Sequence, residues 1–333
     1  MPATRTRAKK IPKFSATLMW GAAALTFLIL VIKNSALAAS LTLSALRVCA
    51  TTLIPALFPS AVAARILAES GALLPLATPL DRISRPVFGL GGEALAVAVT
   101  GIVCGFPTGA VGAMSLYKGG RLSDGQLLRV CLLSGTPSLS FLVFAVGERG
   151  FGDRRVGFFI FFSALFSSAS LTFILSLFDR KKCVFRKYPP FADDFGKKVP
   201  QDPPCGVGIF TTAVSASALD ILKVSAFVVF FSVLSGFAQQ ALSFFVSSPH
   251  ILVILGCLEI TGGMIRAASL SLPLGAPFAA FFAGFGGLCA AAQVASIIRD
   301  SKADLSLYLL LRLLSGLLSA FIFNFFIFFC GKP

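Results

Sequence analysis

The sequence predicts an all-α polytopic membrane protein of two inverted repeats, each with a re-entrant helical hairpin and a broken transmembrane helix. Hydrophobic residues make up 56% of the 333 residues and charged residues only 13%, whereas a soluble domain carries roughly 25% charge. Apolar segments long enough to span a bilayer recur along the chain. Gly and Pro interrupt these segments in the same order in both halves.

Basic residues gather in an amino-terminal arm and in one central loop, and the formal net charge is +15. They are Arg5, Arg7, Lys9, Lys10 and Lys13 in the arm, and Arg180, Lys181, Lys182, Arg186, Lys187, Lys197 and Lys198 in the loop. Lys and Arg beside apolar spans mark cytoplasmic loops, where anionic lipid attracts them. We therefore expect membrane lipid as a partner and no nucleic acid.

The residue types that metal sites and hydrolases need are scarce. The eight cysteines form no C-x-x-C pair, and His250 is the single histidine. H-E-x-x-H and Gly-x-Ser-x-Gly motifs are absent from the sequence. We expect no disulfide framework, no metal, no catalytic residue and no enzymatic activity.

Residues 1–40 are predicted to form the basic arm and an N-terminal transmembrane anchor, with its apolar run at 18–32. The following Ala36-Leu37-Ala38 resembles a signal-peptidase site, so cleavage remains an alternative. We expect an uncleaved anchor, because the rest of the chain is also embedded in the membrane.

The first repeat is assigned to residues 41–178 and opens with an apolar stretch that carries Arg47, Pro55, Pro59 and Arg65. This stretch is either a kinked span or a partly interfacial helix. In order, the repeat comprises that stretch at 41–68, a polar connector at 70–92, a hairpin at about 93–118, a broken helix at about 123–147 and a plain span at 156–178.

The second repeat, residues 211–333, follows a basic, proline-rich cytoplasmic loop at 179–210. It is expected to contain a span at 211–237, a hairpin at about 250–272, a broken helix at about 275–298 and a final span at 305–329. Each half therefore has the order span, broken segment, broken segment, span.

Charge indicates that the halves run in opposite directions. A cytoplasmic central loop requires an odd number of crossings in each half, which predicts one re-entrant segment per half. We assign re-entry to 93–117 and 250–272, because each half-helix there has about a dozen residues and reaches about 18 Å, half the membrane. The result is about seven crossings plus two hairpins.

The interruptions predict a solute site. Backbone N–H and C=O groups freed in hydrocarbon cost several kcal/mol each if they face lipid, so the four breaks should converge on a polar cavity. Alternatively, the Gly and Pro residues are only packing notches. The candidate substrate- or ion-binding residues are Gly105, Phe106, Pro107, Thr108, Gly109, Ser134, Gly135, Thr136, Pro137, Ser138, Glu259, Ile260, Thr261, Gly262, Gly286, Gly287 and Gln293.

Glu259 is the sharpest single candidate, because an ionisable group at mid-segment is expensive and usually functional. It is expected to carry a proton, bind a cation or contact the solute; alternatively, it pairs with Arg266. Arg129 and Arg312 are expected to snorkel to the interface. Asp220 and Lys223 are expected to pair one turn apart.

Several short motifs carry a resemblance to a known family over about residues 41–329. They are Leu53-Ile54-Pro55-Ala56-Leu57-Phe58-Pro59, Gly105-Phe106-Pro107-Thr108-Gly109-Ala110, Leu258-Glu259-Ile260-Thr261-Gly262-Gly263, Phe285-Gly286-Gly287-Leu288 and Gln293-Val294. The chain resembles the YlbJ-type sporulation integral membrane proteins, which contain a nucleoside-recognition, or gate, domain. The resemblance implies a core similar to that of concentrative nucleoside transporters, with dipicolinate as cargo and the membrane surrounding the forespore as location.

The sequence thus predicts a secondary-type transporter of a small, anionic solute in a multi-pass cell membrane. The alternative is a non-transporting scaffold of a sporulation or envelope complex, in which side chains would pack the breaks without a cavity. The expectation is no cofactor; a coupling ion, Na⁺ or H⁺, and an oligomer remain open.

Overall fold

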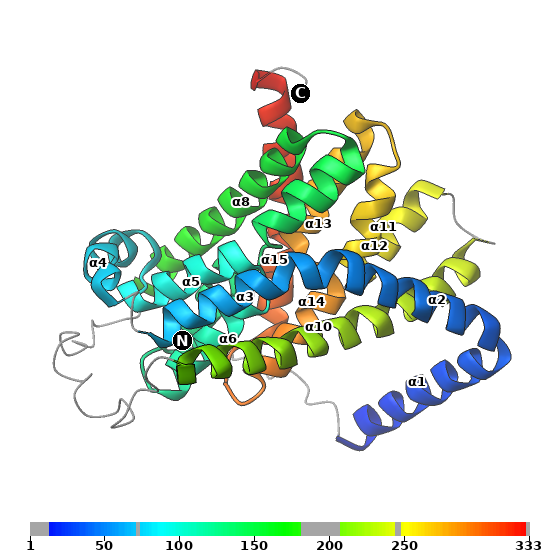
Figure 1. Ribbon diagram of the computed structural model, residues 1–333, viewed down its shortest axis with the longest axis horizontal. Coiled ribbons are helices and arrows are strands. Elements are labelled where there is room, and N and C mark those ends of the chain that lie inside the picture. The colour runs from blue at the N-terminus through cyan, green and yellow to red at the C-terminus, as the bar shows by residue number, and fades with distance from the viewer. Residues whose placement is uncertain (1–12, 71–73, 181–206, 244–247, 331–333) are drawn as a thin grey trace, which may run out of the picture.

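A computed structural model describes residues 13–70, 74–180, 207–243 and 248–330, which form helices and no strand (Figure 1). Most of the predicted basic arm, and residues 181–206 of the central loop, lie outside the described residues. The described part confirms the predicted fold class: two inverted helical repeats, each with a hairpin and a broken helix.

The first long span is continuous where the sequence left a kink open. After α1 (Lys13–Lys33), helices α2 (Ser35–Val48) and α3 (Ile54–Glu69) are joined by a single π-helical turn at Cys49–Leu53. Pro55 follows this turn and has no N–H to donate. The wider turn absorbs the missing hydrogen bond, so the helix continues.

The expected polar connector is itself a helix, α4 (Leu74–Phe88), despite the two prolines inside it. The chain then bends by 88° into the next helix. The Asp81 carboxylate accepts a hydrogen bond from the Gly92 N–H at 2.8 Å. The bend therefore satisfies one of the donors at the start of the following helix.

The first hairpin consists of α5 (Gly92–Cys104) and α6 (Thr108–Lys118), which pack closely through small residues. A Cβ added to Gly101 would lie 2.6 Å from Gly109 Cα. The broken helix follows as α7 (Asp124–Leu133) and the π-helical η2 (Phe141–Phe151). Ser123 and Gln126 form a capping box at the start of α7.

The second repeat has the same order after the long spans α8 (Arg154–Arg180) and α10 (Val207–Leu242). Its hairpin is α11 (Ser248–Leu258) with α12 (Ile260–Ala268), its broken helix is α13 (Leu272–Phe285) with α14 (Gly287–Ile298), and its last span is α15 (Leu305–Cys330). Gly256 and Gly263 bring the two arms of this hairpin into backbone contact.

Polar residues between α8 and α15 hold the core together where water is excluded. The Ser167 hydroxyl donates to the Ser315 carbonyl at 2.6 Å, and both serines are fully buried. Small side chains allow helices to approach closely, and hydroxyls bond across the interface.

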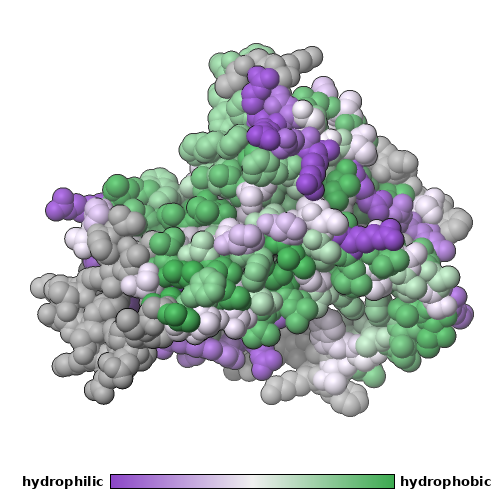
Figure 2. Space-filling view, viewed as in Figure 1, coloured by the Kyte–Doolittle hydropathy of each residue, from purple (hydrophilic) through white to green (hydrophobic). Residues whose placement is uncertain are grey.

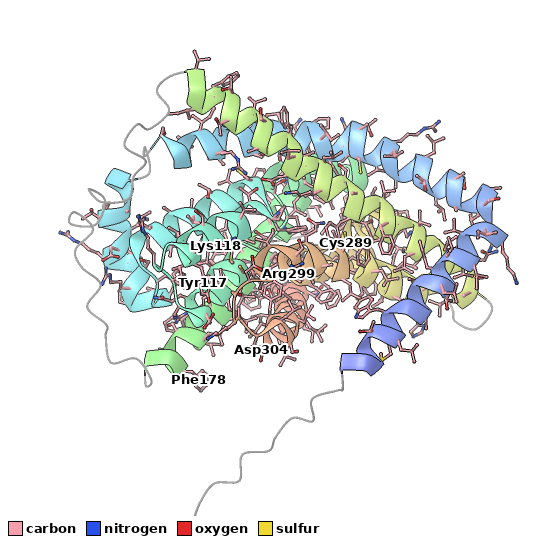
Figure 3. All side chains as sticks on the ribbon, turned by 90° about the horizontal axis from the view of Figure 1, so that it is seen from below. Tyr117, Lys118, Phe178, Cys289, Arg299 and Asp304 are labelled. Atoms are coloured by element: carbon pink, nitrogen blue, oxygen red, sulfur yellow. The ribbon has the colours of Figure 1, made fainter. Side chains whose placement is uncertain are left out.

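Tyr117 and Lys118 at the end of the first hairpin, and Arg299 after α14, lie at the same end of the molecule (Figure 3). Lys118 Nζ lies 3.7 Å from Asp300 Oδ2, and the Lys302 N–H donates to Asp124 Oδ1 at 3.1 Å. These contacts tie the end of the second broken helix to the end of the first hairpin and to the start of the first broken helix.

The outer surface is that of a membrane protein. Hydrophobic side chains cover much of the face crossed by α2, α3 and α10 (Figure 2), and Phe321 and Leu222 are more than 60% exposed. Among the described helices, five are long and apolar enough to cross a membrane, and the bent pair α4–α5 would make a sixth. Fewer described helices than the seven expected crossings are long and apolar enough to span a membrane. The apolar part of α1, Thr17–Lys33, is short, and the broken helix α7–η2 is interrupted.

Candidate functional site

The tip of the first hairpin lies against the first broken helix. Gly105 ends α5 with a φ of +84°, a conformation that favours glycine, and a Cβ added there would lie 2.7 Å from the Ser138 N atom. The Phe106 N–H donates to the Thr136 carbonyl at 3.2 Å. Two predicted groups, residues 105–109 and 134–138, are thus brought together through their backbones.

The break in the first half is built from hydroxyl side chains. Ser138 Oγ accepts a hydrogen bond from the Phe141 N–H at 3.2 Å and so caps the helical stretch that begins at Leu139 and leads into η2. Ser134 Oγ donates to the Val130 carbonyl at 2.7 Å at the end of α7. Thr136 is fully buried, and its hydroxyl has no hydrogen-bond partner within the described residues.

Glu259 forms the tip of the second hairpin. It leaves helical geometry at φ −137° and ψ 117°, and is only 3% exposed. Its carboxylate accepts hydrogen bonds from the Thr261 N–H at 2.7 Å and the Gly262 N–H at 2.6 Å. The carboxylate therefore caps the N-terminus of α12, where negative charge is most favourable.

The second broken helix is held by a buried arginine. Gly286 and Gly287 separate α13 from α14 with φ of +84° and +74°. Arg312 from α15 donates to the Phe285 carbonyl at 2.9 Å and the Ala283 carbonyl at 3.4 Å. The carbonyls at the end of α13, which could otherwise attract a cation, are thus occupied by a guanidinium.

The expectation that the two intramembrane arginines snorkel is wrong. Arg312 is 2% exposed and Arg129 is 5% exposed. Arg312 also reaches the other break, because a Cβ added to Gly135 would lie 2.7 Å from its Nη1 atom. Both helix breaks consequently contact one buried positive charge.

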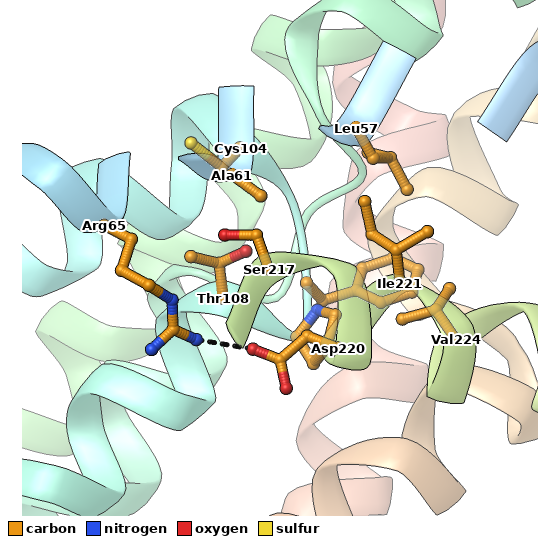
Figure 4. A pocket seen from close by; sticks show the side chains of 11 residues that line it. Leu57, Ala61, Arg65, Cys104, Thr108, Ser217, Asp220, Ile221 and Val224 are labelled. Atoms are coloured by element: carbon orange, nitrogen blue, oxygen red, sulfur yellow. Dashed lines mark hydrogen bonds and ion pairs between the residues drawn. The ribbon is translucent and has the colours of Figure 1, made fainter. Parts of the chain in front are cut away.

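The breaks border two neighbouring pockets, which we name the inner chamber, between the breaks of both repeats, and the outer chamber, beside the tip of the first hairpin. The inner chamber has an empty volume of about 460 Å³, and its wall comprises Leu53, Leu57, Phe106, Pro137, Ser138, Phe141, Val224, Val228, Ile260, Thr261, Cys289 and Gln293. The outer chamber has about 410 Å³, and its wall comprises Leu57, Ala61, Arg65, Cys104, Phe106, Pro107, Thr108, Ser217, Asp220, Ile221 and Val224 (Figure 4). Both volumes include space at the open mouths, and the shared residues Leu57, Phe106 and Val224 make the chambers neighbours.

The structure places eight of the predicted site residues in the cavity wall: Phe106, Pro107, Thr108, Pro137, Ser138, Ile260, Thr261 and Gln293. Gln293 is 3% exposed, and its Oε1 atom has no partner in the described part of the chain. The other predicted residues shape the breaks, and Glu259 directs its carboxylate to α12. Whether any of them binds a solute remains a prediction.

Sequence reasoning placed Thr108 of the outer chamber in the site but not its other polar residues, Arg65, Ser217 and Asp220. Asp220 lies 3.8 Å from Lys223, as predicted, but its closer partner is Arg65, with Nη2 2.6 Å from Oδ2. Arg65 and Asp220 are charges of opposite sign in two otherwise apolar segments, and that signal could have paired them. Ser217 carried no signal, because serine is common in such helices.

No family model matches the sequence. The chain is 25% identical over 296 residues to the sporulation integral membrane protein YlbJ of Bacillus subtilis strain 168, covering 80% of this chain and 72% of that protein. In fold it is similar to the transporter CNTnw. A singly substituted CNTnw variant in an intermediate state has a TM-score of 0.52 and 13% identity over 94% of this chain and 88% of CNTnw.

A doubly substituted CNTnw variant in an outward-facing state gives the same TM-score of 0.52 at 15% identity, over 97% of this chain and 88% of that one. At this identity the likeness concerns the fold alone. The resemblance expected from the sequence motifs is confirmed: the chain is similar to a YlbJ sporulation membrane protein in sequence and to concentrative nucleoside transporters in fold.

Proposed function

We propose that this protein is a secondary-type membrane transporter of a small anionic solute, which binds in the inner chamber between the two hairpin tips and the two broken helices. The observation that carries the proposal is the chamber itself, bordered by Thr261 and Ser138 from different repeats and by the buried Gln293 amide. Its Nε2 group can donate to an anion, and its Oε1 atom has no partner within the described residues. A buried polar atom without a partner costs about 1–3 kcal/mol, which a bound solute or water would recover.

The scaffold alternative expects side chains to fill the breaks. The inner chamber instead favours transport over a scaffold role. The transporter-like fold favours transport over catalysis. The similarity to a sporulation protein supports dipicolinate as the first solute to test, and the membrane surrounding the forespore as the location. A dianion also suits a cavity whose neighbouring breaks share the Arg312 guanidinium.

The test is uptake of radiolabelled dipicolinate into vesicles reconstituted with the purified protein, under an imposed Na⁺ or H⁺ gradient. We expect saturable uptake by the unmodified chain and about 5- to 10-fold weaker apparent affinity for Gln293→Ala, because the variant lacks the amide N–H group that can donate to a charged acceptor. Thr172→Ala is the matched control, because Thr172 is fully buried and donates to the Ser168 carbonyl of its own helix at 2.7 Å. Equal effects of the two variants, or no uptake of this and other small anions, would contradict the proposal.

A further inference from the structure

The outer chamber has chemistry of its own. Its wall brings together Arg65 from α3, Thr108 from the start of α6, and Ser217 and Asp220 from α10, whose side chains surround one space (Figure 4). The inner chamber, by contrast, has no charged side chain among its lining residues. A charged group of a solute held in the inner chamber would therefore find its charged partners in the neighbouring outer chamber.

Helix α6 begins at this chamber without a side-chain cap. It runs for 11 residues from Thr108, and Pro107 at its N-cap position makes no capping hydrogen bond. The first N–H groups of a helix carry the positive end of its dipole and favour anions. At the tip of the other hairpin, the same position is already occupied by the Glu259 carboxylate. The Thr108 and Val111 N–H groups donate to the Gly105 and Pro107 carbonyls at 3.2 and 3.0 Å, so the start of α6 offers the chamber its positive dipole end and the Thr108 side chain.

Ser217 provides an independent sign of a missing partner. It is 1% exposed and lines the outer chamber, yet its Oγ atom has no hydrogen-bond partner within the described residues. Buried serine hydroxyls in helices usually donate to the carbonyl one turn before, as Ser163 does to Phe159 at 2.6 Å. A ligand atom that accepts a hydrogen bond would satisfy Ser217.

Among the described residues, two cations lie beside Asp220, the carboxylate in the chamber wall. Arg65 and Lys223 lie 2.6 Å and 3.8 Å from the carboxylate of Asp220, so two cations face one anion. The side chains of Arg65 and Asp220 are about a quarter exposed, at 25% and 28%. A guanidinium is a planar fork that can contact two acceptors at once, so a second anion can share Arg65 with Asp220.

We propose that the outer chamber is an anion subsite, in which a carboxylate or phosphate group accepts hydrogen bonds from the Ser217 and Thr108 hydroxyls beside the positive end of the α6 dipole. Arg65 neutralises the bound group, and Asp220 competes with it. The subsite rests on the proposed function only in assigning the bound group to the transported solute.

The binding test uses purified full-length protein in phosphatidylcholine nanodiscs, with calorimetric titration of benzoate, inorganic phosphate and the uncharged benzamide. We expect Ser217→Ala to weaken benzoate binding about 5- to 10-fold and Arg65→Gln to weaken it at least about 10-fold. Arg65→Lys should stay within about 3-fold of the unmodified protein, since it keeps the charge. Ser235→Ala is the control, because Ser235 is buried on the same helix but lines neither chamber.

The variant Asp220→Asn distinguishes anion binding by Arg65 from a purely structural role of the Arg65–Asp220 ion pair. Removing the competing carboxylate should tighten benzoate binding by at least about 5-fold and leave benzamide binding unchanged. A purely structural ion pair predicts that Asp220→Asn weakens binding as Arg65→Gln does. That result, or equal effects of Ser217→Ala and Ser235→Ala, or no binding of either anion at about 10 mM, overturns the subsite.

A lipid headgroup and a solute are distinguished by a further arm of the binding test. If the occupant is a lipid headgroup, nanodiscs containing phosphatidylglycerol will weaken benzoate binding relative to phosphatidylcholine, and Ser217→Ala will abolish that difference. Uptake into vesicles separates this inference from the proposed function. Uptake that survives Ser217→Ala and Arg65→Gln unchanged, while both variants weaken anion binding, refutes the assignment of the bound group to the transported solute. Anion binding without uptake refutes transport alone.

Discussion

At the scale of single residues, the two most deeply placed charges of the second repeat each serve a helix end. Glu259 accepts from the first N–H groups of α12, and Arg312 donates to the last carbonyls of α13. Sequence reasoning singled out Glu259 because an ion at mid-segment is expensive. It did not find the cap, which depends on Glu259 leaving helical geometry, or the burial of Arg312, which depends on packing between distant helices.

The cap predicts a stability effect at Glu259. Glu259→Ala leaves the Thr261 and Gly262 N–H groups without their acceptor, so we expect unfolding in detergent to require about 1–2 kcal/mol less free energy. Glu259→Gln should lose about half as much, because an amide oxygen can still accept one bond. Glu148→Gln, at a largely exposed pair with Arg154, should leave the unfolding temperature unchanged. Unaltered stability of Glu259→Ala together with abolished uptake would show that the carboxylate serves the solute instead.

At the scale of elements, the positions of the breaks were predictable and their partners were not. Gly and Pro clusters mark where helices end, because they remove donors or permit left-handed backbone, and the gaps at 105–107, 134–138 and 286 fall within the predicted clusters. We predicted a connector in place of α4, because this segment contains polar residues and two internal prolines. Which break packs against which is set by tertiary contacts that local sequence does not encode.

The contact between the first hairpin tip and the first broken helix predicts a contrast between two glycines. Gly105→Ala would place a Cβ 2.7 Å from the Ser138 N atom at a φ of +84°, whereas Gly120→Ala has a φ of +73° but nothing within 4 Å. We expect Gly120→Ala to cost about 1–2 kcal/mol of backbone strain and Gly105→Ala about 1–3 kcal/mol more. Thermal unfolding of both variants measures the difference, and equal losses would argue against a packed hairpin tip.

At the scale of the whole molecule, charge distribution and repeated order sufficed to predict inverted repeats. Contacts in the structure agree with two distinct ends: Lys118 lies beside Asp300, and Gly150 lies beside Ala268. The described helices include fewer than seven that are long and apolar enough to cross a membrane. A helix that is interrupted can cross without one continuous apolar stretch of full length. The cavity itself could be expected from the energetics of broken backbone, but its polar outer chamber could not.

Inverted repeats with re-entrant hairpins predict the side from which engineered cysteines react. In intact cells expressing a cysteine-free background, Gly119→Cys and Asp300→Cys should resist a membrane-impermeant maleimide, because both lie at the end with the basic central loop. Gly152→Cys and Ser271→Cys should react. Labelling of Gly119→Cys together with protection of the central loop would place the first hairpin across the membrane.

The central claim, that the helix breaks enclose a solute chamber, is tested most directly by protection of Cys289, which lines the inner chamber beside Gln293. In a chain that retains only this cysteine, dipicolinate should slow alkylation at least about 10-fold, as expected for a site more than nine-tenths occupied. A chain that retains only Cys131, which is buried outside both chambers, should react at a rate that dipicolinate does not change. Identical Cys289 alkylation rates with and without dipicolinate, at concentrations that saturate uptake, would contradict the account.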